Sequence, residues 1–361
     1  MHAVYVIRMK DNAPSNNGSV VVGPILGMGG LVAGIALVVL NDPAQVLAAV
    51  TRVGWSIAAI VAVRAIIIAL TGVAWGQIVR PLVRRGFELF VVLRWVREAI
   101  NVLLPVASVG GDVVGARLLT FYGVSGGLAG ASILADLLIQ SFSGLLFTIA
   151  GLVLLAADGR GRSLTGGLMF GIMLGILVIG GFYVAQRAGF FALVERAMLA
   201  AGRWSKTPFS GELKLHENLQ RLYENPVASL RAILAHFVAW LAGTAEVWIA
   251  LECMGASPSI VEAMVLESLG QAVRAATFPV PGAFGVQEGG FLLLGQAYGI
   301  PAEIALALSL VKRVPDIVLG LPGLFFWHLM EARRIVLPSQ ALSTNEPARQ
   351  ALRQSRLPGD R

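Results

Sequence analysis

The sequence is poor in charged residues and contains a single cysteine. Charged residues make up 14% of its 361 positions and hydrophobic residues 56%, whereas about 25% of residues are charged in soluble domains. This composition excludes an ordinary soluble domain. Because Cys253 is the only cysteine, it also excludes an intrachain disulfide and a thiolate cluster for zinc or iron-sulfur chemistry. The four histidines lack metal-site spacing, so we expect neither a metal nor a cofactor.

The apolar residues form runs close to the length of about 20 residues that crosses a bilayer. They predict an all-α polytopic membrane protein with about six transmembrane helices, at residues 20–40, 53–79, 124–156, 164–186, 228–251 and 304–330. The transmembrane domain is thus expected at residues 20–331. Residues 1–19 are predicted to form a cytoplasmic N-terminal segment, and residues 332–361 a disordered cytoplasmic tail.

The net charge of +7 comes largely from arginines in short connections beside the apolar runs. Arg80, Arg84 and Arg85 mark one such connection, and the residues between Arg187 and Arg231 mark another. Cytoplasmic loops of membrane proteins show this bias. We therefore interpret the charge as membrane orientation, with both termini in the cytoplasm, and expect no nucleic-acid partner.

Two further apolar segments, 87–119 and 260–298, are interrupted by proline and glycine. Shifting the sequence by 176 residues aligns like residues in them: Pro105 with Pro281, Asp112 with Glu288, and Tyr122 with Tyr298. We predict that each segment is a broken re-entrant hairpin that enters and leaves on one side. The flanking spans then make an inverted repeat, with halves near residues 53–156 and 228–330. Interrupted helices at matching positions point to the substrate site of a transporter.

Polar groups within apolar segments persist only when they face protein or a wet cavity. Those predicted to bind a substrate headgroup are Glu98, Asn101, Asp112 and Arg117 in the first half, and Arg274, Gln287, Glu288, Lys312, Arg313 and Asp316 in the second. Arg94 and Arg97 lie one turn before Glu98 and Asn101, respectively, and are equally well explained as solvated charges. For Lys312, Arg313 and Asp316, the alternative is a network in which the three neutralise one another.

A secondary polar set is formed by Arg64, Asp136, Glu246, Glu267 and Gln271. Glu267, Gln271 and Arg274 recur at helical spacing and share one stripe, although an internal Glu267 to Arg274 pair would explain this stripe as packing. Asp136 with Arg64, and Glu246 with His236, are candidate pairs for a proton relay or for structure. Sequence position does not decide between these roles.

One enzyme motif occurs, since residues 123–127 read GVSGG and match G-x-S-x-G. A nucleophile elbow needs a strand before it and a helix after it, whereas this stretch connects a predicted hairpin to a span. We therefore expect no catalytic residue here and no enzyme activity.

Three stretches carry a family resemblance: LLPVASVGGDVVGARLL, ESLGQAVRAATFPVPGAFGVQEGGF and LALSLVKRVPDIVLGLPGL. They resemble the flippase-like membrane domain of lysylphosphatidylglycerol synthases. AEVWIALECMG and SLVKRVPD are most similar to the hopanoid-biosynthesis-associated subfamily. The resemblance covers roughly residues 20–331 and implies lipid handling in a bacterial inner membrane. Membrane lipids, and enzymes of lipid or hopanoid biosynthesis, are the implied partners.

The family-like positions are Asp112, Arg117, Arg274, Gln287, Glu288, Lys312, Arg313 and, less closely, Asp316. Only a short polar stretch follows the last span, so we expect no aminoacyl-transfer domain. The favoured function is a lipid transporter whose polar groove carries the headgroup of a hopanoid or an anionic phospholipid between leaflets. The alternatives are an integral-membrane enzyme that modifies lipids and a scaffold for biosynthetic enzymes.

Overall fold

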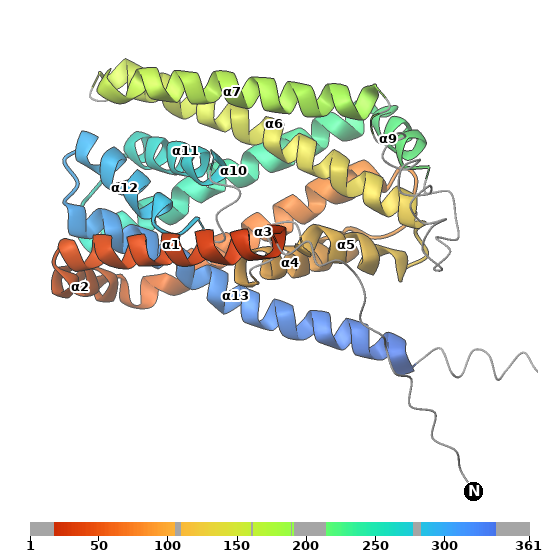
Figure 1. The fold of residues 1–361 in the computed structure, drawn as a ribbon, viewed down its shortest axis with the longest axis horizontal. Coiled ribbons are helices and arrows are strands. Elements are labelled where there is room, and N and C mark those ends of the chain that lie inside the picture. The colour runs from red at the N-terminus through yellow and green to blue at the C-terminus, as the bar shows by residue number, and fades with distance from the viewer. Residues whose placement is uncertain are drawn as a thin grey trace, which may run out of the picture.

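The computed structural model of the chain describes residues 18–104, 110–159, 162–188, 190, 214–276 and 283–336. Within these ranges the regular structure is helical, and no strand occurs there (Figure 1). The predicted all-helical fold is therefore confirmed. The N-terminal segment up to residue 17, most of the second basic connection (residue 189 and residues 191–213) and the tail from residue 337 lie outside the described residues.

The helices run largely alongside one another in Figure 1. The bounds of those before the second basic connection are α1 (Gly18–Leu40), α2 (Pro43–Val53), α3 (Ile57–Val79), α4 (Phe87–Leu103), α5 (Gly110–Thr120), α6 (Gly126–Asp158) and α7 (Arg162–Arg187). Those after it are α9 (Leu215–Tyr223), α10 (Pro226–Met254), α11 (Ile260–Ala276), α12 (Val286–Ala297) and α13 (Ala302–Val336). A short 3₁₀ turn, Gly54–Ser56, joins α2 to α3.

Local sequence explains where several of these helices begin. The side chains of Asp42, Ser125 and Asn225 accept backbone N–H groups at the first turns of α2, α6 and α10, which satisfies donors that a helix start leaves free. Proline follows the cap in α2 and α10, where its missing N–H costs nothing.

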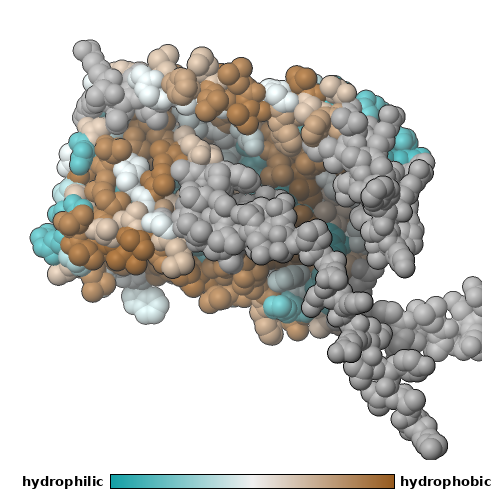
Figure 2. Space-filling view, viewed as in Figure 1, coloured by the Kyte–Doolittle hydropathy of each residue, from teal (hydrophilic) through white to brown (hydrophobic). Residues whose placement is uncertain are grey.

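Four helical segments among the described residues are long and apolar enough to cross a membrane: Pro43–Val79, Gly126–Asp158, Met169–Arg187 and Pro226–Met254. They coincide with four of the six predicted spans. The other two, 20–40 and 304–330, fall on α1 and α13, and their crossing stays a prediction. Among the coloured residues on the face drawn in Figure 2, hydrophobic ones predominate between the two ends of the molecule and hydrophilic ones gather toward the ends. A bilayer-facing surface has this distribution.

The repeat seen in the sequence is also present in the helix boundaries. Helices α6 and α13 begin at residues 126 and 302, which is the same offset of 176 residues. The helix contacts match as well: α4 packs against α13 of the other repeat, and α11 packs against α6. Helices α3 and α10 meet at the centre. The two repeats therefore exchange equivalent contacts.

Each interrupted segment forms two helices in contact, α4 with α5 and α11 with α12. The breaks themselves, at residues 105–109 with Pro105 and at residues 277–282 with Pro279 and Pro281, lie outside the described residues. That these hairpins re-enter the membrane stays a prediction.

Candidate functional site

Asp136, in the middle of α6, is the centre of the first buried ionic cluster. Its side chain is 0% exposed. Oδ2 accepts hydrogen bonds from Arg97 Nη1 at 2.9 Å and Arg94 Nη1 at 3.2 Å, while Oδ1 lies 3.1 Å from His236 Nε2. The two arginines come from α4 and the histidine from α10. A carboxylate that would be costly alone in the membrane is thus surrounded by cations and hydrogen-bond donors.

Arg97 also holds the two helices of the first hairpin together. Arg97 donates to Asp112 Oδ1 from Nη2 at 2.6 Å and from Nε at 3.0 Å, so α5 is held against α4. Gly115 leaves room for this contact, because a Cβ there would come within 2.5 Å of Arg97 Cγ. Asn101 Oδ1 accepts the backbone N–H of Gly111 at 2.8 Å. We name Arg94, Arg97, Asp112, Asp136 and His236 the first cluster.

Lys312, on α13, is the centre of a second buried cluster. Its Nζ donates to Glu267 Oε2 at 2.6 Å and to Glu246 Oε2 at 3.3 Å. Glu246 Oε2 also accepts from Arg64 Nη2 at 2.8 Å, and Glu267 Oε1 accepts from Gln271 Nε2 at 2.8 Å. A Cβ at Gly243 would lie 2.8 Å from Glu267 Oε1, so this glycine lets the carboxylate approach α10.

Glu288 and Arg313 form an ion pair beside Lys312. Glu288 Oε1 accepts from Arg313 Nη2 at 2.8 Å and from Ser309 Oγ at 2.9 Å. Its Oε2 accepts the backbone N–H of Gly285 at 2.7 Å. The Arg313 guanidinium also lies 3.9 Å from the centre of the Phe284 ring. We name Arg64, Glu246, Glu267, Lys312, Glu288 and Arg313 the second cluster.

Helix α1 passes next to this ion pair. A Cβ at Gly34 would lie 3.4 Å from the backbone nitrogen of Gly285 and 3.8 Å from the carboxyl carbon of Glu288. In Figure 1, α1 extends along the front of the molecule. The Glu288 pair is therefore enclosed by α12, α13 and α1.

The centres of the two clusters occupy equivalent positions with opposite charge. Asp136 in α6 corresponds to Lys312 in α13 under the offset that superimposes the helix starts. Asp136 contacts two arginines and a histidine, whereas Lys312 contacts two glutamates. Asp112 and Glu288 also correspond, and each pairs with an arginine. The repeats thus preserve the position of a buried charge but not its sign.

A narrow crevice lies between the clusters. Its lining includes Arg64, Trp95, Glu98 and Asp316, and it has about 10 Å³ of space for water. Trp95 Nε1 donates to the carbonyl of Leu319 at 2.8 Å, which fixes α4 against α13. Asp316 makes no hydrogen bond or ion pair with another described residue, but its charge faces Arg64. Polar side chains of α3, α4 and α13 therefore line a crevice where the two repeats meet.

The structure corrects the predicted ion pairs. Arg64 pairs with Glu246 and Asp136 with His236, which reverses the partners expected from sequence. The reason is that Arg64 faces α10 along the central α3 and α10 contact, while α4 supplies the arginines that meet Asp136.

Two alternatives that rested on local pairing are also corrected. One alternative was an ion pair of Glu267 with Arg274 within the same helix. The ion pair of Glu267 is instead with Lys312 of α13. Lys312 and Arg313 are neutralised by acids of other helices, not by Asp316. Long-range contacts therefore satisfy these charges.

The predicted headgroup residues do not all lie together. Asp112 belongs to the first cluster, and Glu98 joins it through Arg94 at 3.5 Å. Gln287 is buried next to Glu288 in α12, and Arg274 lies at the end of α11. Arg117 is different: its side chain is 63% exposed and pairs with Glu331 at 3.1 Å. The structure therefore separates Arg117 from both clusters.

Sequence reasoning gave too little weight to Arg94 and Arg97. Both are buried, and the side chain of Arg97 is only 2% exposed. A signal was present, because Asp136 lies in an otherwise apolar span and needs a cation partner. His236 contacts Asp136 and not Glu246, the acid predicted from sequence.

Within the part of the chain that the structure describes, no three His, Cys, Asp or Glu side chains are placed to hold a metal ion. What the described geometry provides is a set of fixed cations and carboxylates inside a helical bundle. Such groups can exchange a bound carboxylate for another anion, or move protons between acids.

The comparisons with known proteins agree with a membrane protein of this kind. The family model described as the lysylphosphatidylglycerol synthase TM region matches residues 22–323. No curated protein and no solved structure matches the chain. The matched range includes every residue of the two clusters, from Arg64 to Arg313. The chain therefore belongs to the family of lysylphosphatidylglycerol synthase transmembrane regions.

Proposed function

We propose that the protein moves an amphipathic lipid between the leaflets of a bacterial inner membrane, with the lipid headgroup bound at the second cluster. The family is connected with lipid modification or flipping, which makes a lipid the natural substrate. The observation that carries the proposal is the pair of buried ionic clusters at equivalent positions of two repeats. Paired repeats around a polar site are a recurrent design of transporters.

The second cluster is the better headgroup site because one of its cations can be reached. The side chain of Arg313 is 19% exposed, whereas that of Arg97 is 2% exposed. A guanidinium binds phosphate through two parallel hydrogen bonds, as it binds a carboxylate. An anionic headgroup therefore competes with Glu288 for Arg313.

Glu288 must then find another partner or take up a proton, since an unpaired buried carboxylate is costly. Ser309 and the N–H of Gly285 remain as donors to it. Binding of the headgroup is thereby linked to protonation of Glu288. Where Glu288 takes up the proton, headgroup binding is coupled to the proton gradient across the membrane, and this gradient is the energy source in place of nucleotide hydrolysis.

Glu246 offers a contact for a headgroup that carries hydroxyl groups. Its Oε2 accepts from Arg64 and Lys312, but its buried Oε1 accepts no hydrogen bond from the described residues. A hydroxyl donor at this oxygen would satisfy it. A polyol headgroup, such as that of a hopanoid, fits this site together with the anionic phospholipids.

The proposed topology has six spans, two re-entrant hairpins in inverted orientation and both termini in the cytoplasm. It is supported by the four apolar helices, the matching helix boundaries and the positions of the arginines.

The test is a lipid-movement assay on the full chain in reconstituted vesicles. Fluorescent phospholipid in the outer leaflet and in the inner leaflet is distinguished by a membrane-impermeant quencher. We expect Glu288→Gln and Arg313→Ala each to slow leaflet exchange at least tenfold. Arg221→Gln is the matched control, because this exposed side chain pairs only with Glu217 on α9.

Wild-type rates in both cluster variants would overturn the headgroup site. If the wild type itself leaves the probe in place but converts it chemically, the protein is a lipid-modifying enzyme instead. A scaffold for biosynthetic enzymes would show neither movement nor conversion.

A further inference from the structure

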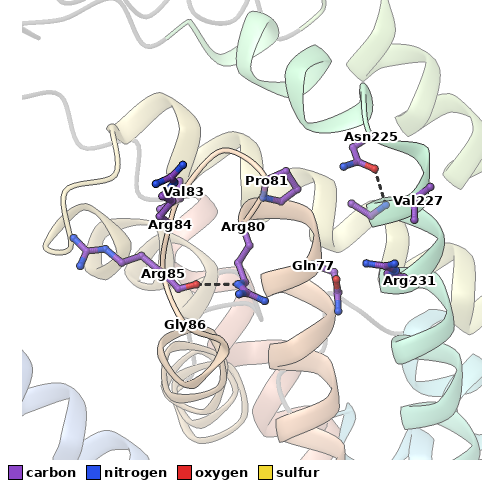
Figure 3. A pocket seen from close by; sticks show the side chains of 11 residues that line it. Gln77, Arg80, Pro81, Val83, Arg84, Arg85, Gly86, Asn225, Val227 and Arg231 are labelled. Atoms are coloured by element: carbon purple, nitrogen blue, oxygen red, sulfur yellow. Dashed lines mark hydrogen bonds between the residues drawn. The ribbon is translucent and has the colours of Figure 1, made fainter.

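A polar pocket lies away from both clusters, between the end of α3 and the start of α10. It is an open pocket with a volume of about 740 Å³, within the range of ligand sites in proteins. Its lining comes from three places, as Figure 3 shows: the last turn of α3, the connection from α3 to α4, and the first turns of α10. The lining residues are Gln77, Arg80, Pro81, Val83, Arg84, Arg85, Gly86, Asn225, Val227, Ala228 and Arg231.

This pocket is strongly basic. Four of its lining residues are arginines: Arg80, Arg84, Arg85 and Arg231. Among the described residues that line it, none is acidic. The acids closest in the chain are Glu224, which precedes Asn225, and Glu88, which packs back against Gly86, and neither is part of the lining. Like charges collected in one concave site raise the local concentration of anions.

Two of the arginines are held in place by the protein. Arg80 Nε donates to the carbonyl of Arg85 at 2.9 Å, and its guanidinium lies 3.9 Å from the centre of the Phe87 ring. Arg85 Nη2 donates to the carbonyl of Tyr122 at 2.6 Å. These contacts use only part of each guanidinium. The remaining N–H groups are available to a ligand.

The other two arginines are exposed and have no fixed partner. Arg84 and Arg231 form no hydrogen bond or ion pair with another residue that the structure describes. They lie on different elements, since Arg84 is in the α3 to α4 connection and Arg231 is in α10. A ligand between them would be contacted from both sides. Two separate guanidinium groups suit a phosphate, which has several acceptor oxygens.

The pocket also borders apolar surface. Leu82 is 44% exposed beside it, and Val227, in its lining, is 54% exposed. By the predicted orientation, this end of α3 faces the cytoplasm, where basic groups close to a helix end meet anionic lipid headgroups.

We propose that this pocket is a binding site for a phosphate-bearing anion, held between Arg84 and Arg231 with Arg80 beside them. The ligand is either the headgroup of an anionic lipid or a soluble phosphate compound, and the shared chemistry is the phosphate. The site does not depend on the proposed lipid movement, because none of its residues belongs to either ionic cluster.

Calorimetric titration of the purified full chain in a neutral detergent tests the site. Three probes are compared: short-chain phosphatidic acid, inorganic pyrophosphate and an uncharged short-chain diacylglycerol. The variant Arg84→Gln/Arg231→Gln should weaken binding of the phosphate probes at least tenfold, equal to about 1.4 kcal/mol. Affinity should also fall as NaCl concentration rises. Arg52→Gln/Arg221→Gln removes the same charge elsewhere and serves as the control.

Each result assigns or rejects the site. Specific binding of phosphatidic acid alone identifies a lipid headgroup site, binding of pyrophosphate alone identifies a soluble ligand, and binding of both identifies a general phosphate site. The proposal is overturned if neither phosphate probe binds, if diacylglycerol binds equally well, or if the control variant loses as much affinity as the pocket variant. The single variants Arg84→Gln and Arg231→Gln, each expected to lose part of the affinity, keep the test valid if the double variant is unstable.

Discussion

The two ionic clusters occupy equivalent places in the repeats but differ in sign and access. In the first cluster one carboxylate, Asp136, lies between two arginines and a histidine, and all of them are buried. In the second, a lysine lies between two glutamates, and a separate pair, Glu288 with Arg313, reaches partly exposed surface. From this difference we infer a division of labour. The first cluster stabilises the helix bundle, and the second binds and releases the lipid headgroup of the proposed function.

The largest effect is expected from breaking the first cluster at its centre. Asp136→Leu leaves Arg94 and Arg97 buried without their shared partner, which should lower the free energy of unfolding by about 3 to 5 kcal/mol. Asp136→Asn, which keeps the size and part of the hydrogen bonding, should cost less. Equilibrium unfolding in mixed micelles, followed by tryptophan fluorescence, measures both. Equal stability of Asp136→Leu and wild type would show that the cluster does not hold the fold.

Removing the centre of the second cluster should cost less. In Lys312→Met, Glu246 keeps Arg64 and Glu267 keeps Gln271, so we expect a loss of about 2 to 3 kcal/mol. The double variant Lys312→Met/Glu267→Gln removes the unpaired charge and should recover at least about 1 kcal/mol of it. The same unfolding assay applies. A double variant less stable than the single one would contradict the pairing.

The division of labour itself is tested by comparing the two arginines that pair with the equivalent acids. Arg313→Ala should reduce lipid movement strongly while lowering stability by only about 1 to 3 kcal/mol, because Glu288 keeps two donors. Arg97→Ala should do the reverse, with a greater loss of folded protein than of movement per folded molecule. Vesicle assays normalised to folded protein separate the two. Identical profiles for both variants would remove the distinction.

The smallest effect is expected at Arg117, which the structure places outside both clusters. Its exposed pair with Glu331 should contribute no more than about 1 kcal/mol. Arg117→Gln should therefore change the melting temperature by a few degrees at most and leave lipid movement close to wild type. A strong loss of movement would return Arg117 to the headgroup site predicted from sequence.

Sequence alone predicted the features that depend on local pattern. Apolar runs predicted the helices, and the alignment of Pro105 with Pro281 predicted the offset that the starts of α6 and α13 reproduce. The acids Asp112 and Glu288 were recognised because carboxylates in apolar segments are costly.

The choice of ion-pair partners could not be predicted. Arg64, Glu246, Asp136 and His236 are four ionisable groups on three long helices, and the rotation of each helix decides which of them meet. Spacing excludes the predicted pair of Glu246 with His236, because the two lie ten residues, or about 15 Å, apart along α10. It does not show which acid Arg64 meets. The burial of Arg94 and Arg97 was also hidden, because they follow a basic connection and a sequence does not show whether α4 turns inward.

The exchange of packing between the repeats has a mechanical consequence. Helix α4 lies on α13, which carries Lys312 and Arg313, while α11 lies on α6, which carries Asp136. A hairpin that moves therefore pushes the long helix of the opposite repeat and, with it, the charge at the centre of the opposite cluster. Because α3 and α10 also contact each other, we expect a substitution that loosens one hairpin to disturb the ionic cluster of the other repeat.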